Sequence, residues 1–212
     1  MRRFLLGLVF FVIGGSAAAG LSIVRQPRSQ IAAAHPAANP ALPAGRVAVS
    51  PASVRQAYAD GLIARPIATV LNVPGRMSYG DYRWDDKGVP AGPTWVRVDL
   101  GSQLLSVFRG GHEIGTAVIL YGADAMRTPT GRFPIRAKLK DHRSQTYDAA
   151  MPFTLRLTAD GVSIHGSNVR WGYATHGCVG VPTDFAAKLY DAVSIGDEVL
   201  IIDGARPARR RA

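Results

Sequence analysis

The residues of this 212-residue chain that can do covalent chemistry gather between positions 165 and 178. Cys178, the chain's single cysteine, follows His176 by two residues and His165 by thirteen. A thiol attacks as its thiolate, and an imidazole within hydrogen-bond reach promotes that form. Gly177 lets the backbone beside the cysteine turn its N–H groups toward one point, where they can hold a developing oxyanion. The pattern therefore indicates nucleophilic catalysis by Cys178.

Two other interpretations of the same residues remain open at this stage. A lone cysteine is most often buried and inert. A metal site built from His165, His176 and Cys178 would need a fourth ligand or an open position, and the sequence nearby offers no further Asp, Glu or His. We therefore expect no metal and no cofactor, and one cysteine excludes both an intrachain disulfide and a Cys₄ or Cys₂His₂ zinc site.

The elements that must position these side chains are mostly strands. From Trp95 onward apolar and polar residues alternate with period two, interrupted by turns at 101–103 and 109–112, which predicts a β-meander. His165 follows the apolar strand residues Val162 and Ile164, and Cys178 precedes a predicted helix. Further strands are expected at 133–139, 153–157, 162–165 and 198–203, and the main helix at 183–193 with Thr183 as its cap.

The remaining segments divide the chain into five parts. Residues 1–24 combine an Arg pair, an apolar run and small residues, which is typical of a signal peptide or, if retained, a membrane anchor through residues 4–24. Residues 25–49 are an Ala/Pro-rich linker, and 50–93 a short helix, capped by Ser50 and ended by Gly61, followed by an irregular strap. The catalytic domain is expected at 94–203, and a basic, disordered tail at 204–212.

The net charge of +10 resides at the ends of the chain. Residues 1–93 carry +6, residues 94–203 carry 0 and residues 204–212 carry +4. Nucleic-acid binding proteins carry their basic patch on the folded domain, so no nucleic-acid partner is expected. Basic ends suit a protein near an anionic membrane or wall polymer.

Four stretches in sequence order resemble the L,D-transpeptidase catalytic domain, the YkuD-like family of cell-wall enzymes. Residues 95–109 resemble the first hairpin of that family, and residues 128–133 its Thr-Pro-Thr-Gly-x-Phe loop. The strand from Met151-Pro-Phe to His165-Gly166 and the signature Thr175-His-Gly-Cys178 follow. The resemblance covers residues 94–203 and implies a mainly β, sandwich-like domain with one main helix.

The resemblance also implies a reaction and roles. Cys178 would attack the third residue of a peptidoglycan stem peptide, and a second stem would take the acyl group in a 3→3 crosslink. His165 would be the proton donor and acceptor, His176 would orient the loop, and Gly177 would supply an oxyanion N–H. The substrate-binding residues would be Thr130, Gly166, Tyr173 and Thr175. The protein would act in the periplasm.

One position departs from the family pattern. Gly180 stands where the family usually has an arginine, which leaves Arg170, Arg127 or Arg132 as candidates to replace that cation. The alternatives are an L,D-carboxypeptidase or hydrolase that uses water, an enzyme that attaches a protein lysine to the wall, and a wall-binding protein with impaired catalysis. The acyl acceptor and the oligomeric state are not predicted.

Overall fold

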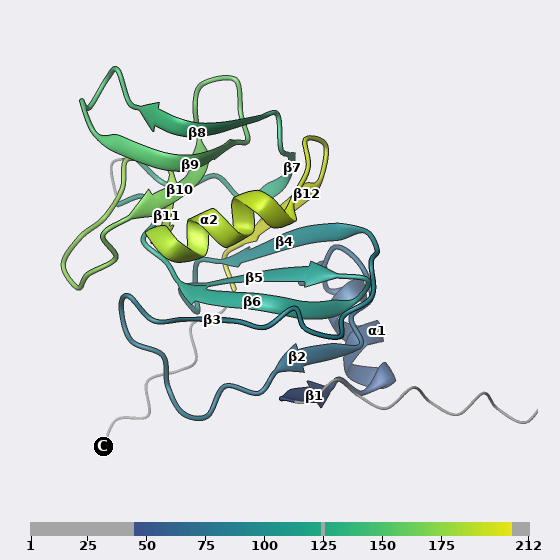
Figure 1. The fold of residues 1–212 in the computed structure, drawn as a ribbon. Helices are drawn as coiled ribbons and strands as arrows, with labels where there is room; N and C mark the ends of the chain where they lie inside the picture. The colour runs from purple at the N-terminus through teal and green to yellow at the C-terminus, as the bar shows by residue number, and fades with distance from the viewer. Residues whose placement is uncertain (1–44, 124–125, 205–212) are drawn as a thin grey trace, which may run out of the picture. The chain divides into compact units, whose positions relative to one another are not determined.

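The computed structural model describes residues 45–123 and 126–204, and the elements are labelled in Figure 1. Two helices and twelve strands occur in these residues. In chain order they are β1 (Arg46–Ala48), α1 (Pro51–Ala59), β2 (Thr69–Leu71), β3 (Tyr82–Trp84), β4 (Thr94–Asp99), β5 (Leu104–Arg109), β6 (His112–Val118), β7 (Gly131–Pro134), β8 (Ala137–Arg143), β9 (Ala150–Arg156), β10 (Ser163–Ser167), β11 (Val179–Pro182), α2 (Thr183–Ala192) and β12 (Glu198–Ile202).

The strands form two sheets (Figure 1). The larger sheet has the order β1-β2-β6-β5-β4-β12-β7, with β3 also paired to β6. Its centre is the predicted meander, in which β4, β5 and β6 pair antiparallel. The smaller sheet has the order β11-β10-β9-β8, and its β10–β11 pair is parallel. That parallel pair places the residues after His165 beside those after Cys178.

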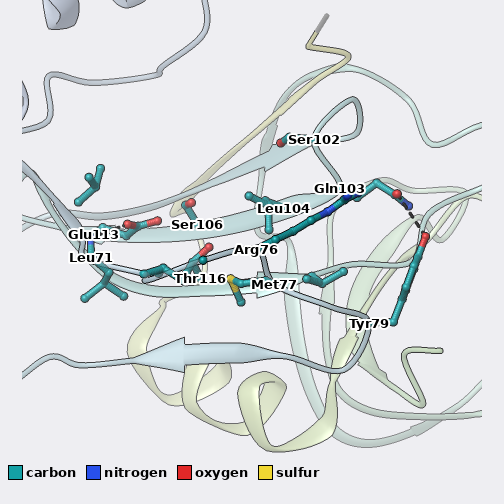
Figure 2. Close-up of a pocket in the computed structure, with 14 residues that line it drawn as sticks. Leu71, Arg76, Met77, Tyr79, Ser102, Gln103, Leu104, Ser106, Glu113 and Thr116 are labelled. Atoms are coloured by element: carbon teal, nitrogen blue, oxygen red, sulfur yellow. Dashed lines mark hydrogen bonds between the residues drawn. The ribbon is translucent and has the colours of Figure 1, made fainter. Parts of the chain in front are cut away.

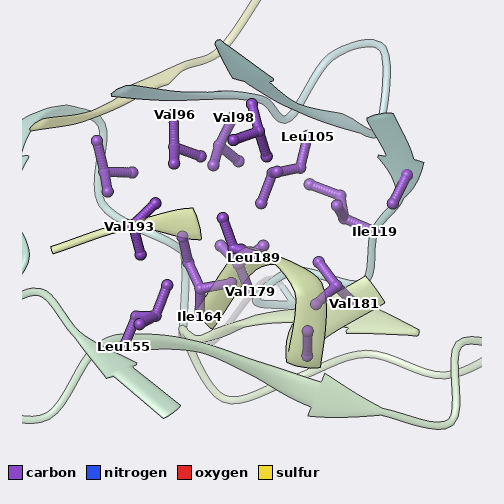
Figure 3. Packing of buried hydrophobic residues seen from close by; sticks show 14 of the residues in the cluster. Val96, Val98, Leu105, Ile119, Leu155, Ile164, Val179, Val181, Leu189 and Val193 are labelled. Atoms are coloured by element: carbon purple, nitrogen blue, oxygen red, sulfur yellow. The ribbon is translucent and has the colours of Figure 1, made fainter. Parts of the chain in front are cut away.

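Helix α2 packs on β9 and β10, and Figure 1 shows it between the smaller sheet and β4–β6. Its buried residues are Phe185, Ala186 and Leu189, whereas α1 has none, so α2 is the single main helix. Figure 3 shows Leu189 among valines, leucines and isoleucines of both sheets, including Val96 and Ile164. This shared core joins the sheets into one body, and the predicted mainly β, sandwich-like fold with one main helix is confirmed.

The two helices begin differently. Ser50 caps α1 through its Oγ, which accepts from the Ser53 N–H, and Gly61 follows the helix with a φ of +70°, as predicted. The prediction for α2 was wrong in one respect, since Thr183 is its first residue and Pro182 its N-cap. Pro182 has no side-chain hydrogen-bonding group and also ends β11, so the strand runs directly into the helix.

Several predicted loop or strand boundaries differ from the structure. Residues 46–48, placed in the linker, form β1, and the predicted irregular strap contains β2 and β3. These strands have three residues each, too few to show a period of two. The strand predicted at 133–139 is two strands, because Pro134 ends β7 on the larger sheet before β8 begins on the smaller one.

Three predicted segments lie wholly or mainly outside the described residues: the signal or anchor at 1–24, the linker at 25–49 and the tail at 204–212. Within 45–123 and 126–204, neither helix has the length and hydropathy that a bilayer crossing requires.

Candidate active site

A cavity of about 870 Å³ opens beside the smaller sheet, and His165 and Cys178 both line it. We call it the Cys178 cleft. Among the other residues that line it are His142, Tyr147, Arg156 and Asp160, from β8, β9 and the loops that follow them. The cysteine is half-buried and so reachable from the cleft, which distinguishes it from an inert core thiol.

The segment 120–123 holds the cysteine loop on both sides. Backbone hydrogen bonds join Leu120 to Gly180 in both directions, at 2.8 and 2.9 Å, and the Thr175 N–H donates to Tyr121 O at 3.1 Å. Between these anchors the Thr175 hydroxyl donates to the carbonyl of Cys178. Cys178 therefore lies on a loop whose two ends are both fixed by the segment 120–123.

Thr128, the first residue of the predicted Thr-Pro-Thr-Gly loop, supports the same arrangement. Its buried hydroxyl accepts from the Gly122 N–H at 2.9 Å and lies 3.5 Å from the Cys178 carbonyl oxygen. A Cβ on Gly122 would lie 1.9 Å from the Met126 carbonyl oxygen, so only glycine fits there. The contact seen for this motif is thus with the backbone that carries the nucleophile.

The sulfur of Cys178 lies against the turn that leads into β10. The thiol donates to the Gly161 carbonyl at an Sγ–O distance of 3.8 Å, and the Ser163 N–H donates toward the sulfur. Burial raises the pKa of the Cys178 thiol, the Ser163 N–H opposes this, and the Asp160 carboxylate adds to it. The resting side chain is therefore a thiol at neutral pH.

His165 has the protonation state that a complementary base needs. Its Nδ1 lies 2.9 Å from the Gly166 carbonyl oxygen, and because a carbonyl can only accept, Nδ1 carries the proton and Nε2 has the free lone pair. The side chain is 8% exposed, and this burial lowers the pKa of the imidazole, with a further lowering by His142. His165 is thus neutral at pH 7, and its Nε2 is ready to accept a proton.

The structure gives a physical account of Gly180. It lies opposite His165 in the parallel β10–β11 register, and a Cβ there would be 2.9 Å from Ser167 Oγ and 3.0 Å from Ser167 Cβ. Ser167 Oγ in turn lies 3.3 Å from Nδ1 of His165. The volume into which an arginine at 180 would project is occupied by a serine that contacts the base.

Three predicted site residues line the Cys178 cleft together with the cysteine and His165: Tyr173, Thr175 and His176. Tyr173 is 62% exposed, and Thr175 bonds the Cys178 carbonyl as described. His176 stacks on Tyr147, with ring centroids 4.2 Å apart and planes 11° apart. That contact ties the cysteine loop to the loop between β8 and β9.

The other three predicted residues lie outside the lining of the cleft. Thr130 is exposed just before β7. Gly166 is buried, where a Cβ would be 3.0 Å from Pro152 Cγ and 3.3 Å from Thr183 Cα, and its carbonyl orients the base. Gly177 has a φ of +101°, a conformation that favours glycine directly before the nucleophile.

Sequence reasoning missed Arg156, His142 and Tyr147, all of which line the cleft. The three arginines named as replacements for the family's arginine do not line it: Arg132 pairs with Glu198, Arg170 bonds Asn168, and Arg127 is exposed. Arg156 lies on the strand before His165, but its place in the cleft could be predicted only from the register between the two strands.

Among the described residues no three His, Cys, Asp or Glu side chains group closely enough to hold a metal ion.

A second cavity, of about 430 Å³, lies against β2, β5 and β6 (Figure 2). We call it the Glu113 cavity. Glu113 is 6% exposed, and its Oε2 accepts from the Leu71 N–H at 2.8 Å. Burial raises the pKa of the Glu113 carboxyl, against the lowering effects of the Ser106 hydroxyl, the Leu71 N–H and the Arg46 guanidinium.

Comparison with known proteins matches residues 93–201 to the model of the family YkuD, L,D-transpeptidase catalytic domain. L,D-transpeptidase 1 of Mycobacterium tuberculosis is 27% identical over 136 residues, which cover 55% of this chain and 53% of that protein, so the chain spans about half of its relative's length. The crystal structure of an L,D-transpeptidase from Stackebrandtia nassauensis is 26% identical, with a TM-score of 0.50, 62% of this chain and 63% of that chain being covered. Because the family model matches more than half of the residues, including His165 and Cys178, the chain belongs to the YkuD family of L,D-transpeptidase catalytic domains.

Proposed function

We propose that this protein is a peptidoglycan L,D-transpeptidase that forms 3→3 crosslinks through a thioester on Cys178. The observation that carries the proposal is the pairing, in one cleft of about 870 Å³, of a reachable thiol with a neutral imidazole whose Nε2 is free. Membership in the YkuD family supplies the class of substrate. The partners are stem peptides of peptidoglycan, encountered after export to the periplasm.

In the first half-reaction, the thiol of Cys178 loses its proton to Nε2 of His165 as the sulfur attacks the carbonyl carbon of the third stem residue. The tetrahedral oxyanion accepts hydrogen bonds from backbone N–H groups at Gly177 and Cys178. The C–N bond then breaks, and the imidazolium returns the proton to the leaving amine of the terminal D-residue. A thioester and a free D-amino acid result.

In the second half-reaction, the side-chain amine of the third residue in another stem attacks the thioester. Nε2 of His165 removes the amine proton, the C–S bond breaks, and the sulfur recovers a proton from the imidazolium. Because the thiol and the imidazole both start neutral, His165 is neutral at the beginning and at the end of each half-reaction. The site therefore needs no permanent ion pair between Cys178 and His165.

The test uses the full-length chain, purified in detergent under reducing conditions and mixed with disaccharide-tetrapeptides. Mass spectrometry follows three species: 3→3 dimers, tripeptide with free D-amino acid, and the acylated protein. Cys178→Ala is the matched variant, since it removes one sulfur from a half-buried position. We expect dimers and a thioester adduct from the wild type and neither from Cys178→Ala.

Tripeptide as the sole product would replace the transpeptidase with an L,D-carboxypeptidase that uses the same nucleophile. An adduct that discharges only when a lysine-bearing protein is added would instead favour attachment of proteins to the wall. A wild type that forms no adduct with any stem peptide, although a small alkylating reagent modifies Cys178, would overturn the proposed function in favour of a wall-binding protein.

A further inference from the structure

Arg156 is the described arginine that lines the Cys178 cleft, and its guanidinium lacks the partners that a buried cation usually has. Its Nε is buried and finds no hydrogen-bond acceptor in the described part of the chain. The ion pairs found between described residues all involve other arginines: Arg65, Arg97, Arg109, Arg132 and Arg143. A partly buried guanidinium without a carboxylate is costly, so it points to an anion that arrives from outside.

The position of Arg156 relative to the nucleophile follows from strand register. Ser163 pairs with Arg156 on β9, and Ile164 pairs with Val179 on β11, so Ser163 lies between Arg156 and Cys178 in one row across the sheet. Strands lie about 4.8 Å apart, which puts the α-carbons of Arg156 and Cys178 roughly 10 Å apart. Paired positions in a row share a face of the sheet, and both Arg156 and Cys178 line the Cys178 cleft.

Resting on the proposed function, we propose that Arg156 binds the terminal carboxylate of the leaving D-residue in the acyl donor. In that donor, three bonds separate the attacked carbonyl carbon from the terminal carboxylate carbon. A substrate with its carbonyl at Cys178 Sγ therefore carries its terminal carboxylate a short way along the cleft, in reach of the Arg156 guanidinium. The binding selects stems that end one residue after the bond to be broken.

This assignment explains why the position of Gly180 can remain without a cation. The face of the cleft next to His165 is filled by Ser167, whose side chain leaves no room for a residue larger than glycine at 180. Arg156 on β9, two strands away from β11, supplies the positive charge that an arginine at position 180 would otherwise supply. Asp160 also lines the cleft and is exposed, and its carboxylate would repel a substrate carboxylate that Arg156 attracts.

The test compares Arg156→Gln and Arg156→Lys with a matched control, Arg170→Gln, which removes an exposed arginine outside the cleft lining. Donors are a tetrapeptide stem with a free terminal carboxylate, the same stem with a terminal carboxamide, and a stem amidated on the side chain of its third residue. For Arg156→Gln we expect KM for the free acid to rise about 10- to 100-fold with a smaller change in kcat. Lysine should restore part of the loss, and the control should match the wild type.

The terminal amide should be a poor donor for the wild type and no worse for Arg156→Gln, because the interaction is already lost. Transfer from a preformed thioester to an amine should be unchanged, since the leaving residue has departed. Equal losses on acid and terminal amide, or a loss that follows amidation of the third residue, would overturn the assignment.

A binding measurement separates this inference from the proposed function. Calorimetry with Cys178→Ala, alone and combined with Arg156→Gln, needs no turnover. Tighter binding of the free acid than of its amide by Cys178→Ala, abolished in the double variant, supports the role of Arg156 even if no crosslink forms. Equal binding of acid and amide by Cys178→Ala refutes it even if crosslinks do form.

Discussion

The Cys178 cleft and the Glu113 cavity both contain buried titratable groups, but they differ in which of these groups already have hydrogen-bond partners in the protein. The Glu113 carboxylate accepts from Leu71 and Ser106, and both terminal nitrogens of Arg46 donate to carbonyl oxygens, those of Glu113 and Asp85. The Cys178 cleft is lined by Cys178, by His165 with a free lone pair on Nε2, and by Arg156, whose buried Nε has no acceptor in the described part of the chain. The Glu113 carboxylate is therefore committed to hydrogen bonds within the protein, whereas His165 and Arg156 keep hydrogen-bonding capacity that a substrate can use.

The same comparison explains what each region does for the chain. Arg46 on β1 and Leu71 on β2 are bound to β6 through Glu113, which fastens the segment before the catalytic domain to the larger sheet. Around the Cys178 cleft, the His165 ring donates to the Gly166 carbonyl, and the hydroxyls of Thr175 and Thr128 donate to the Cys178 carbonyl. The first network stabilises an edge of the sheet, and the second orients a site.

The largest expected effect tests whether the two cavities have different roles in catalysis. His165→Gln removes the base and should lower kcat for crosslinking by about 10²- to 10⁴-fold, since that is the usual contribution of a positioned general base. Glu113→Gln is the matched carboxylate-to-amide change in the other cavity and should leave kcat within about twofold. Turnover of disaccharide-tetrapeptides measures both, and circular dichroism checks that each variant folds. A similar loss for both variants would contradict the division of roles.

The next effect concerns the packing of Gly180 against Ser167. Gly180→Ala should lower the free energy of unfolding by about 1–3 kcal/mol, because its Cβ would lie 2.9 Å from Ser167 Oγ and 3.0 Å from Ser167 Cβ. Adding Ser167→Gly should recover part of this loss, since the two residues are in contact. Urea unfolding of the two single variants and the double variant measures the coupling, and strictly additive losses would show that the clash is relieved in another way.

A smaller effect is the pH dependence of the free energy of unfolding, to which His165 and Glu113 contribute with opposite signs. Burial lowers the pKa of His165, so below about pH 6.5 the unfolded chain binds more protons and stability falls as pH falls. Burial raises the pKa of Glu113, so as pH rises through about 4.5 and above, the folded chain holds the extra proton and stability falls as pH rises. His165→Gln should flatten the first slope and Glu113→Gln the second, in unfolding series across pH 4–8. Removal of either group without change in its slope would contradict the assignment.

The smallest effect tests the stack that joins the cysteine loop to the β8–β9 loop. Tyr147→Ala should lower kcat/KM about 2- to 10-fold, because an aromatic contact of this kind contributes about 0.5–1.5 kcal/mol. Tyr58→Ala, an exposed tyrosine on α1, is the matched control and should have no effect. Loss of stability without loss of kcat/KM would make the stack a purely structural contact.

Local patterns in the sequence predicted what depends on neighbouring residues. The period of two from Trp95 predicted the meander, Ser50 and Gly61 predicted the ends of α1, and the apolar residues on one helical face predicted α2. The spacing of His165 and Cys178, with Gly177 beside the thiol, indicated the nucleophile and its base. These features could be predicted because helices, turns and motif loops are determined over a few residues.

The rest depended on contacts between residues far apart in the chain. Only the parallel β10–β11 register sets Gly180 against Ser167, and only the β9–β10 register puts Arg156 in the row of Cys178. The tautomer of His165 follows from the orientation of the Gly166 carbonyl, and the depressed pKa of the imidazole follows from its burial in the folded chain. The sequence by itself determined which residues can react. The tertiary structure decided their protonation and the charge that faces them, because register and burial are properties of the assembled sheets.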